Sequence, residues 1–174
     1  MSAIGTHAQP SRMARLEYDI RKFTERLGRT AFLVAPPLLR VALAVPFFRS
    51  GLTRWDGFFS LSPSAAYLFE NMFKLHVFGG AYGFPAPLLV ARMVGTAEIV
   101  LPILLVLGLA TRYAALGLLV MTGVIQLVAP DGWANFHLPW AALALAIIAL
   151  GAGPLSLDNL IGRASGRGKA LAAA

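Results

Sequence analysis

Residues 91–109, ARMVGTAEIVLPILLVLGL, form an apolar run that contains a single acidic residue, Glu98. The run is long enough to cross the hydrocarbon core of a bilayer as a helix, which needs about 20 apolar residues. A carboxylate inside such a helix is energetically costly and normally faces a partner within the protein. The stretch therefore predicts a membrane-spanning helix and raises the question of which group neutralises Glu98.

The composition of the whole chain supports a membrane protein. Of the 174 residues, 57% are hydrophobic and 13% are charged, whereas soluble domains carry roughly 25% charged residues. The mean hydropathy is +0.69. The chain has no cysteine, so it cannot ligate an iron–sulfur cluster or attach haem covalently through its own thiols.

Four apolar segments are long enough to span a bilayer. They run from about 30 to 52, 87 to 109, 113 to 129 and 136 to 153. We therefore divide the chain into a basic N-terminal segment (1–29), a four-helix membrane domain (30–162) and a basic, alanine-rich tail (163–174). An even number of spans places both termini on one side, and because both are basic, the positive-inside rule predicts the cytoplasmic side of the inner membrane.

The formal net charge of +7 is concentrated at the two ends of the chain. Among the charges of residues 12–29 stand only two aromatic residues, Tyr18 and Phe23, and among those of 163–169 there is none, so the regular interleaving that a nucleic-acid stacking surface would need is missing. Basic residues beside apolar spans instead favour contact with anionic lipid. We expect the lipid bilayer as a partner and no nucleic acid.

Two further helices are expected outside the spans. In the first outer connection, Ser62 is a typical N-cap, Pro63 suits the first helical position and Gly79 follows the expected end. Glu70 and Lys74 would form an i,i+4 pair on this amphipathic helix. The highly charged stretch 16–27 reads as a surface helix on the cytoplasmic side. The predicted fold is therefore an all-α transmembrane bundle of four helices with these two additions.

Arg40 lies near the middle of the first predicted span, as Glu98 does in the second. Antiparallel neighbours at matching depth would form a buried ion pair, which serves either as a structural pin or as a proton or substrate site. Gly95 leaves space beside Glu98, and Pro102 cannot donate the helical hydrogen bond to the Glu98 carbonyl. These residues form a candidate notch that holds a polar group or admits a neighbouring helix.

A second collection of polar and aromatic residues falls at the outer ends of the spans. Its members are Arg54, Trp55, His76, Trp133, Asn135 and His137. Such residues are ordinary interfacial anchors, and the alternative is a pocket for a quinone head group. His76 is expected to point into the bundle. The spacing of the histidines matches no metal site, so no metal is expected.

Three stretches resemble the DoxX family of membrane proteins. They are LLRVALAVPFFRSGLTRWDG (38–57), ARMVGTAEIVLPILLVLGLATRYAALGLLVMTGV (91–124) and GAGPLSLDNLIG (151–162). The likeness covers about residues 33–162 in the family's order, with its intramembrane glutamate, its GL-x-TR turn and its closing G-x-G-x-x-S-L-D.

The resemblance implies a four-helix multi-pass protein in which Arg40, Glu98, Arg112, Ser156 and Asp158 are family positions. Arg54 stands where many members have lysine. The segment from about 60 to 87 is longer than minimal members need. Family members are linked to respiratory or redox complexes and to oxidative stress, although fold alone does not settle function.

Three functions follow as hypotheses. The first is a redox-associated subunit that binds quinone or anchors a soluble oxidoreductase, with Arg40 holding Glu98 ionised and Glu98 or His76 exchanging a proton. An enzymatic role is expected only as a subunit of such a quinone-linked oxidoreductase. The second is a non-enzymatic scaffold or assembly factor, and the third is a small transporter or proton pathway through Glu98, which would need a homo-oligomer.

Overall fold

The structure is a computed structural model that describes residues 12–164 and 166. The elements in chain order are α1 (Arg12–Leu52), β1 (Trp55–Gly57), β2 (Ser60–Leu61), α2 (Pro63–Tyr67), the π-helical turn η1 (Leu68–Met72), β3 (Lys74–Val77), β4 (Gly80–Gly83), α3 (Pro87–Leu107), α4 (Thr111–Val128), the 3-10 turn η2 (Pro130–Gly132), the π-helical turn η3 (Trp133–His137), α5 (Leu138–Leu150) and α6 (Leu157–Ala164).

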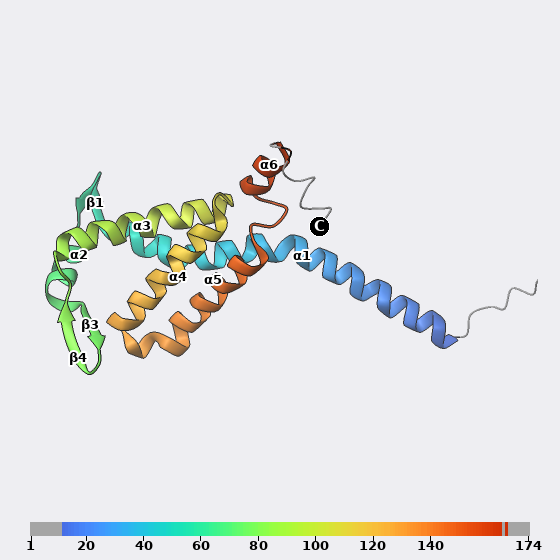
Figure 1. The fold of residues 1–174 in the computed structure, drawn as a ribbon, viewed down its shortest axis with the longest axis horizontal. Helices are drawn as coiled ribbons and strands as arrows, with labels where there is room; N and C mark the ends of the chain where they lie inside the picture. The colour runs from blue at the N-terminus through green and yellow to red at the C-terminus, as the bar shows by residue number, and fades with distance from the viewer. Residues whose placement is uncertain (1–11, 165, 167–174) are drawn as a thin grey trace, which may run out of the picture.

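Four helical segments are long and apolar enough to cross a membrane, which confirms the predicted helical membrane fold. They are Arg15–Leu52, Pro87–Leu107, Thr111–Val128 and Pro130–Leu150. Helix α1 packs mainly against α3, and α4 packs against α5 (Figure 1). The two short hairpins lie at one end of the bundle, here called the hairpin end, and α6 lies at the other, the α6 end.

The core of the bundle combines large aliphatic side chains with alanines. Its buried members are Leu43, Ala44, Phe47, Leu105, Ala114, Ala115, Leu118, Ala144 and Ile147. Alanines at helix contacts let backbones approach closely, and in lipid this close packing is a main source of helix association. The outward-facing Leu, Val and Ile residues remain exposed and form the surface that faces lipid.

Helix α1 is 41 residues long, which corresponds to about 61 Å of helix. The hydrocarbon core needs only about 30 Å, so the N-terminal part of α1 extends beyond the bundle (Figure 1). The predicted helix over 16–27 is present and exposed, and it continues into the first span without a break, so both belong to the single helix α1. Gly28 is the only helix-weakening residue between them, and a single glycine costs a helix only about 1 kcal/mol.

The outer connection is partly as predicted. Ser62 caps α2, and its Oγ accepts a hydrogen bond from the Ala65 amide at 3.2 Å. The helical segment ends at Met72, however, well before Gly79. Strands β3 and β4 follow as an antiparallel hairpin, with Phe78 and Gly79 both at positive φ in its two-residue turn.

The expected Glu70–Lys74 helical pair was therefore wrong, because Lys74 is the first residue of strand β3. At the α6 end, α5 stops before Gly151, and both Gly151 and Gly153 adopt positive φ. The chain then turns back toward the α3–α4 connection before α6 begins. Of the predicted tail 163–174, the structure describes only 163, 164 and 166.

Candidate functional site

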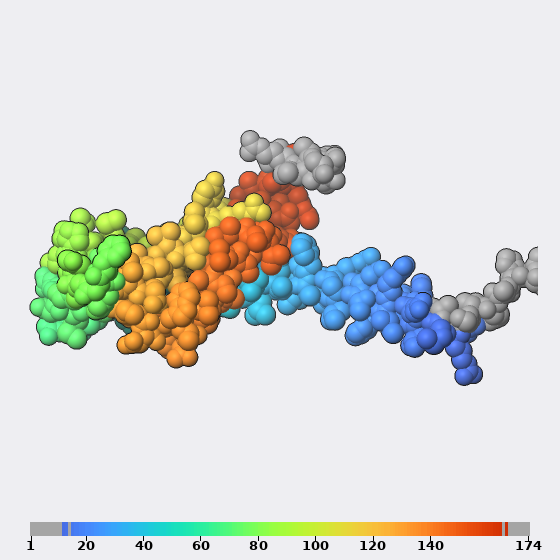
Figure 2. Space-filling model, turned by 60° about the horizontal axis from the view of Figure 1, so that its bottom comes forward, coloured from blue at the N-terminus to red at the C-terminus, as the bar shows by residue number. Residues whose placement is uncertain are grey.

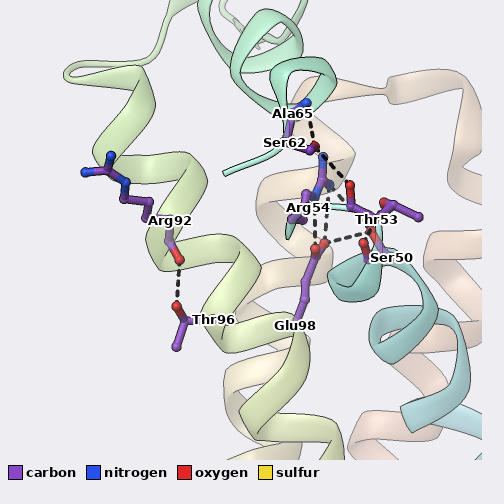
Figure 3. A network of polar contacts seen from close by, with 8 residues as sticks. All are labelled: Ser50, Thr53, Arg54, Ser62, Ala65, Arg92, Thr96 and Glu98. Carbon is purple, nitrogen blue, oxygen red and sulfur yellow. Dashed lines mark hydrogen bonds and ion pairs between the residues drawn. The ribbon is translucent and has the colours of Figure 1, made fainter. Parts of the chain in front are cut away.

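Glu98 forms its ion pair with Arg54 (Figure 3). The Arg54 Nε donates to Glu98 Oε2 at 3.0 Å, and Nη2 lies 3.4 Å from Oε1. The Ser50 hydroxyl donates to Oε1 at 3.0 Å. The side chain of Glu98 is 2% exposed and that of Arg54 13%. Both carboxylate oxygens are thus satisfied by Ser50 in the last turn of α1 and Arg54 just after it.

The predicted Arg40–Glu98 pair was wrong, and the register of α1 against α3 gives the reason. Gly51 packs against the backbone of Glu98, whereas Arg40 lies against Gly108 just after α3 ends. Arg40 is therefore displaced by about 16 Å of helix from the level of Glu98. The two predicted spans overlap in length, but α1 ends halfway along α3 and their midpoints do not coincide.

Two glycines permit this close approach. A Cβ on Gly51 would lie 2.9 Å from the carbonyl carbon of Glu98, and one on Gly95 would lie 3.1 Å from Arg54 Cβ and from the Trp55 ring. The predicted notch consisted of Gly95 and Pro102. Gly95 gives room for the backbone segment that carries Arg54 and Trp55. Pro102 lies elsewhere, beside an apolar groove that it lines with Val45 and Phe48.

A cavity of about 260 Å³ adjoins the ion pair. Ser50, Arg54 and Glu98 supply its polar lining, and the other lining residues are Pro46, Phe47, Phe69, Phe73, Phe84, Val94, Val124, Ile125, Val128, Ala129 and Trp140. The guanidinium carbon of Arg54 lies 5.3 Å from the Phe69 ring centroid and 5.8 Å from that of Phe73. We call this space the Arg54–Glu98 cavity.

The six residues of the predicted outer pocket do not line one common site in the structure. Arg54 alone of its six members lines the Arg54–Glu98 cavity. Trp55 lines a separate apolar groove with Phe58 and Phe59, and its buried Nε1 has no hydrogen-bond partner among the described residues. His76 is exposed in β3, and its Nδ1 lies 3.1 Å from the Leu127 carbonyl. The expectation that His76 points into the bundle was wrong, because its segment is a strand rather than a helix.

The remaining three members lie on the turn η3. Trp133 and Asn135 are exposed, whereas His137 is buried. The Nδ1 of His137 lies 2.6 Å from Gln126 Oε1, and Gln126 Nε2 donates to the Pro130 carbonyl at 3.1 Å. These hydrogen bonds link the C-terminal turn of α4, which carries Gln126, to the turns η2 and η3 that connect it with α5. Within residues 12–164 and 166, no group of three His, Cys, Asp or Glu side chains is placed to hold a metal ion.

Arg40 binds backbone carbonyls at the α6 end instead of a carboxylate oxygen. Its guanidinium donates to the carbonyls of Pro36 at 3.3 Å, Val106 at 3.5 Å and Leu155 at 2.5 Å. The residue is 2% exposed. A buried guanidinium satisfied by carbonyls of three separate segments holds α1, the end of α3 and the chain before α6 together.

Asp158 completes this second cluster. Its carboxylate accepts hydrogen bonds from the Ala110 amide at 2.8 Å, the Thr111 amide at 2.9 Å and the Thr111 hydroxyl at 2.8 Å. Burial raises the pKa of Asp158, but the bonds from Thr111 and Ala110 and the charge of Arg40 outweigh it and hold the pKa below its usual value of 3.8. Asp158 thereby caps the start of α4.

The family positions recognised in the sequence thus divide between two clusters. Arg54 and Glu98 lie together beside the cavity, and Arg40 and Asp158 lie together at the α6 end. Sequence reasoning missed Ser50 and the aromatic lining, which comes from α1, η1, the outer loop and α5. Only the i,i+4 spacing of Ser50 and Arg54 was visible as a signal.

Comparison with known proteins gives two matches. The family model described as DoxX matches residues 35–131. A protein of Haemophilus influenzae, described as an uncharacterized protein, is 32% identical over 136 residues, which cover 71% of this chain and 81% of the relative. No solved structure matches the chain.

Proposed function

Because the chain belongs to the DoxX family of membrane proteins, we propose that it is an integral subunit of a redox complex and that the Arg54–Glu98 cavity receives a quinone head group. One observation carries this proposal: the cavity combines aromatic walls with a single cluster of polar groups that neutralise one another. That combination suits an uncharged, flat ring with carbonyl oxygens better than it suits an ion.

The shape and lining of the cavity support a small apolar ligand. Its volume of about 260 Å³ is close to the lower end of the roughly 300–1,000 Å³ typical of small-molecule sites. The rings of Phe47, Phe69, Phe73, Phe84 and Trp140 line it, and aromatic rings favour offset or edge-to-face contact with another ring. These rings would contact the flat face or the edge of a quinone ring.

The polar cluster supplies both a donor and a proton-holding group. The hydrogen bonds of Arg54 to the described residues use Nε and Nη2, and a guanidinium carries more N–H donors than these. Arg54 would therefore donate to a ligand oxygen while it keeps Glu98 oriented. When bound, a quinone supplies electron transfer coupled to proton transfer, and the Glu98 carboxylate is the group at the cavity that can hold such a proton.

The site changes two roles expected from the sequence. Arg54 takes the place of Arg40 as the cation that pairs with Glu98. His76 bonds to the Leu127 carbonyl and is absent from the cavity lining, so Glu98 remains as the proposed proton group. We also propose that the basic N-terminal part of α1 lies in the cytoplasm of the cell, on the inner side of its membrane, where a soluble oxidoreductase would dock.

Extraction and mass spectrometry of the gently purified protein test this proposal. The test compares Val124→Phe, which fills the cavity, with Val120→Phe, a matched change on the same helix at an exposed residue outside the lining. The parent and Val120→Phe should retain quinone in proportion to protein, and Val124→Phe should lose it. If all three carry only bulk phospholipid, the quinone site is wrong and a scaffold role is favoured.

A further inference from the structure

The part of α1 outside the bundle carries a regular apolar stripe. We call residues 12–29 the α1 extension, and they correspond to about 27 Å of helix. The stripe consists of large apolar side chains that are alternately three and four residues apart. They are Met13, Leu16, Ile20, Phe23 and Leu27. This alternation is the a and d pattern of a heptad repeat, in which the stripe faces another helix.

No other part of the described chain covers this stripe. Met13 is 68% exposed, Ile20 55% and Phe23 66%. Figure 2 shows the extension projecting away from the body of the molecule. Because α1 is longer than the bilayer needs, the extension is not required for the span, and a contiguous apolar surface outside a bilayer marks an interaction site.

We propose that the stripe pairs with the same stripe of a second copy of this chain, as a parallel two-stranded coiled coil. Two copies inserted in one membrane share one orientation, so their α1 helices run in the same direction. Met13, Ile20 and Leu27 then occupy the a positions, and Leu16 and Phe23 occupy the d positions. Each side chain meets its own equivalent across a two-fold axis along the membrane normal.

The charges beside the stripe fit this arrangement. In a parallel pair, a g residue faces the e residue five positions later on the partner helix. Arg12 therefore faces Glu17 of the other copy, with opposite charges. Asp19 faces Thr24, so no like charges are brought together there.

Arg26 occupies the next g position and faces the uncharged Ala31 of the other copy. The remaining basic residues of the extension point away from the stripe. Arg15, Arg21, Lys22 and Arg29 occupy the b and c positions of the repeat. Arg21 contacts Glu25 of its own helix at 3.5 Å. The concentration of positive charge in this segment is therefore compatible with pairing through the opposite face.

The bundle leaves the stripe open where α1 enters the membrane. Leu27, Val34 and Val41 follow one another at heptad spacing, and all three are exposed. The a edge of α1 is therefore open over residues 27–41, whereas Ala44, at a later d position, is buried in the bundle. The extension is shorter than the three to four heptads that usually sustain a coiled coil, but anchoring in one membrane raises the effective concentration of the two helices.

Disulfide cross-linking in native membranes tests this pairing, and the natural chain has no cysteine to interfere. Ile20→Cys places a thiol on the stripe, and Glu25→Cys places one on the opposite face as the matched control. Mild oxidation should give a covalent dimer with Ile20→Cys and several-fold less with Glu25→Cys. Equal yields at both positions, or none at either, would overturn the pairing and leave lipid head groups or a soluble protein as the occupant.

A charge swap in the Ile20→Cys protein tests the parallel register. Glu17→Arg places like charges at the Arg12 contact and should lower the dimer yield. Adding Arg12→Glu should restore it, because the opposite charges then return with their positions exchanged. A yield that falls and is not restored would overturn the parallel register, whatever ligand occupies the Arg54–Glu98 cavity.

Discussion

Arg54 Nε lies 3.0 Å from Glu98 Oε2, although 44 residues separate the two in the sequence. This contact joins the turn directly after α1 to the middle of α3. Removing one partner of a buried ion pair leaves an uncompensated charge, which is more damaging than removing both. We therefore expect a substitution of Arg54 alone to be more destabilising than substitution of Arg54 and Glu98 together.

Arg54→Leu should destabilise the folded protein by roughly 3–5 kcal/mol, because Glu98 then stays buried without its cation. The double variant Arg54→Leu, Glu98→Leu should recover much of this loss. Unfolding midpoints of the purified proteins in one detergent provide the measurement. Equal stability of Arg54→Leu and the parent would mean that the ion pair contributes little to the fold.

Gly51→Ala should disrupt the contact of α1 with α3, since the new Cβ would lie 2.9 Å from the Glu98 backbone. Gly123→Ala in α4 is the matched control, because a Cβ there meets nothing within 4 Å. The control should gain about 0.5–1 kcal/mol from removing a helical glycine. The yield of folded protein and the melting temperature measure both effects, and a stable Gly51→Ala protein would contradict the close register.

Arg40→Met should loosen the chain around α6, because the Leu155 and Val106 carbonyls lose their donor. Hydrogen exchange of the amides in 151–164 should speed up, while the hairpin end keeps its protection. Arg49→Met, the same change at an exposed residue of α1, is the control. If exchange rises equally in both variants, Arg40 has no particular role in holding this segment.

Asp158 should make stability depend on pH at the acid end of the range. Its folded pKa lies below the ordinary value of 3.8, so its stabilising effect is present above that value and is lost as pH falls through the folded pKa. Asp158→Asn removes this dependence and lowers stability at neutral pH. Thermal unfolding at decreasing pH should therefore show a steeper loss for the parent than for the variant.

If the melting temperatures of the parent and of Asp158→Asn fall equally steeply with decreasing pH, other carboxylates are responsible for the acid sensitivity. Glu98 lies at the other cluster and is unchanged in this comparison. The two clusters can thus be examined independently, since substitutions at distant sites without shared partners usually have additive effects.

The sequence by itself determined the number and identity of the membrane helices. Apolar runs near residues 30–52 and 87–109 exceed the length of a bilayer, and backbone groups in lipid are satisfied most simply by a helix. The N-cap at Ser62 and the turn after Leu107 were also visible, because local side-chain chemistry and glycine decide such ends. The resemblance to the DoxX family also identified Arg40, Glu98 and Asp158 as family positions.

Only the tertiary structure decided which of these residues meet. Hydropathy shows that a segment is long enough to span, but it carries no information on how far one helix is shifted along its neighbour. That shift is set by contacts such as Gly51 against Glu98 and by the path of residues 53–86. It places Arg54 at Glu98 and leaves Arg40, about 16 Å of helix away, to bind the carbonyls at the α6 end.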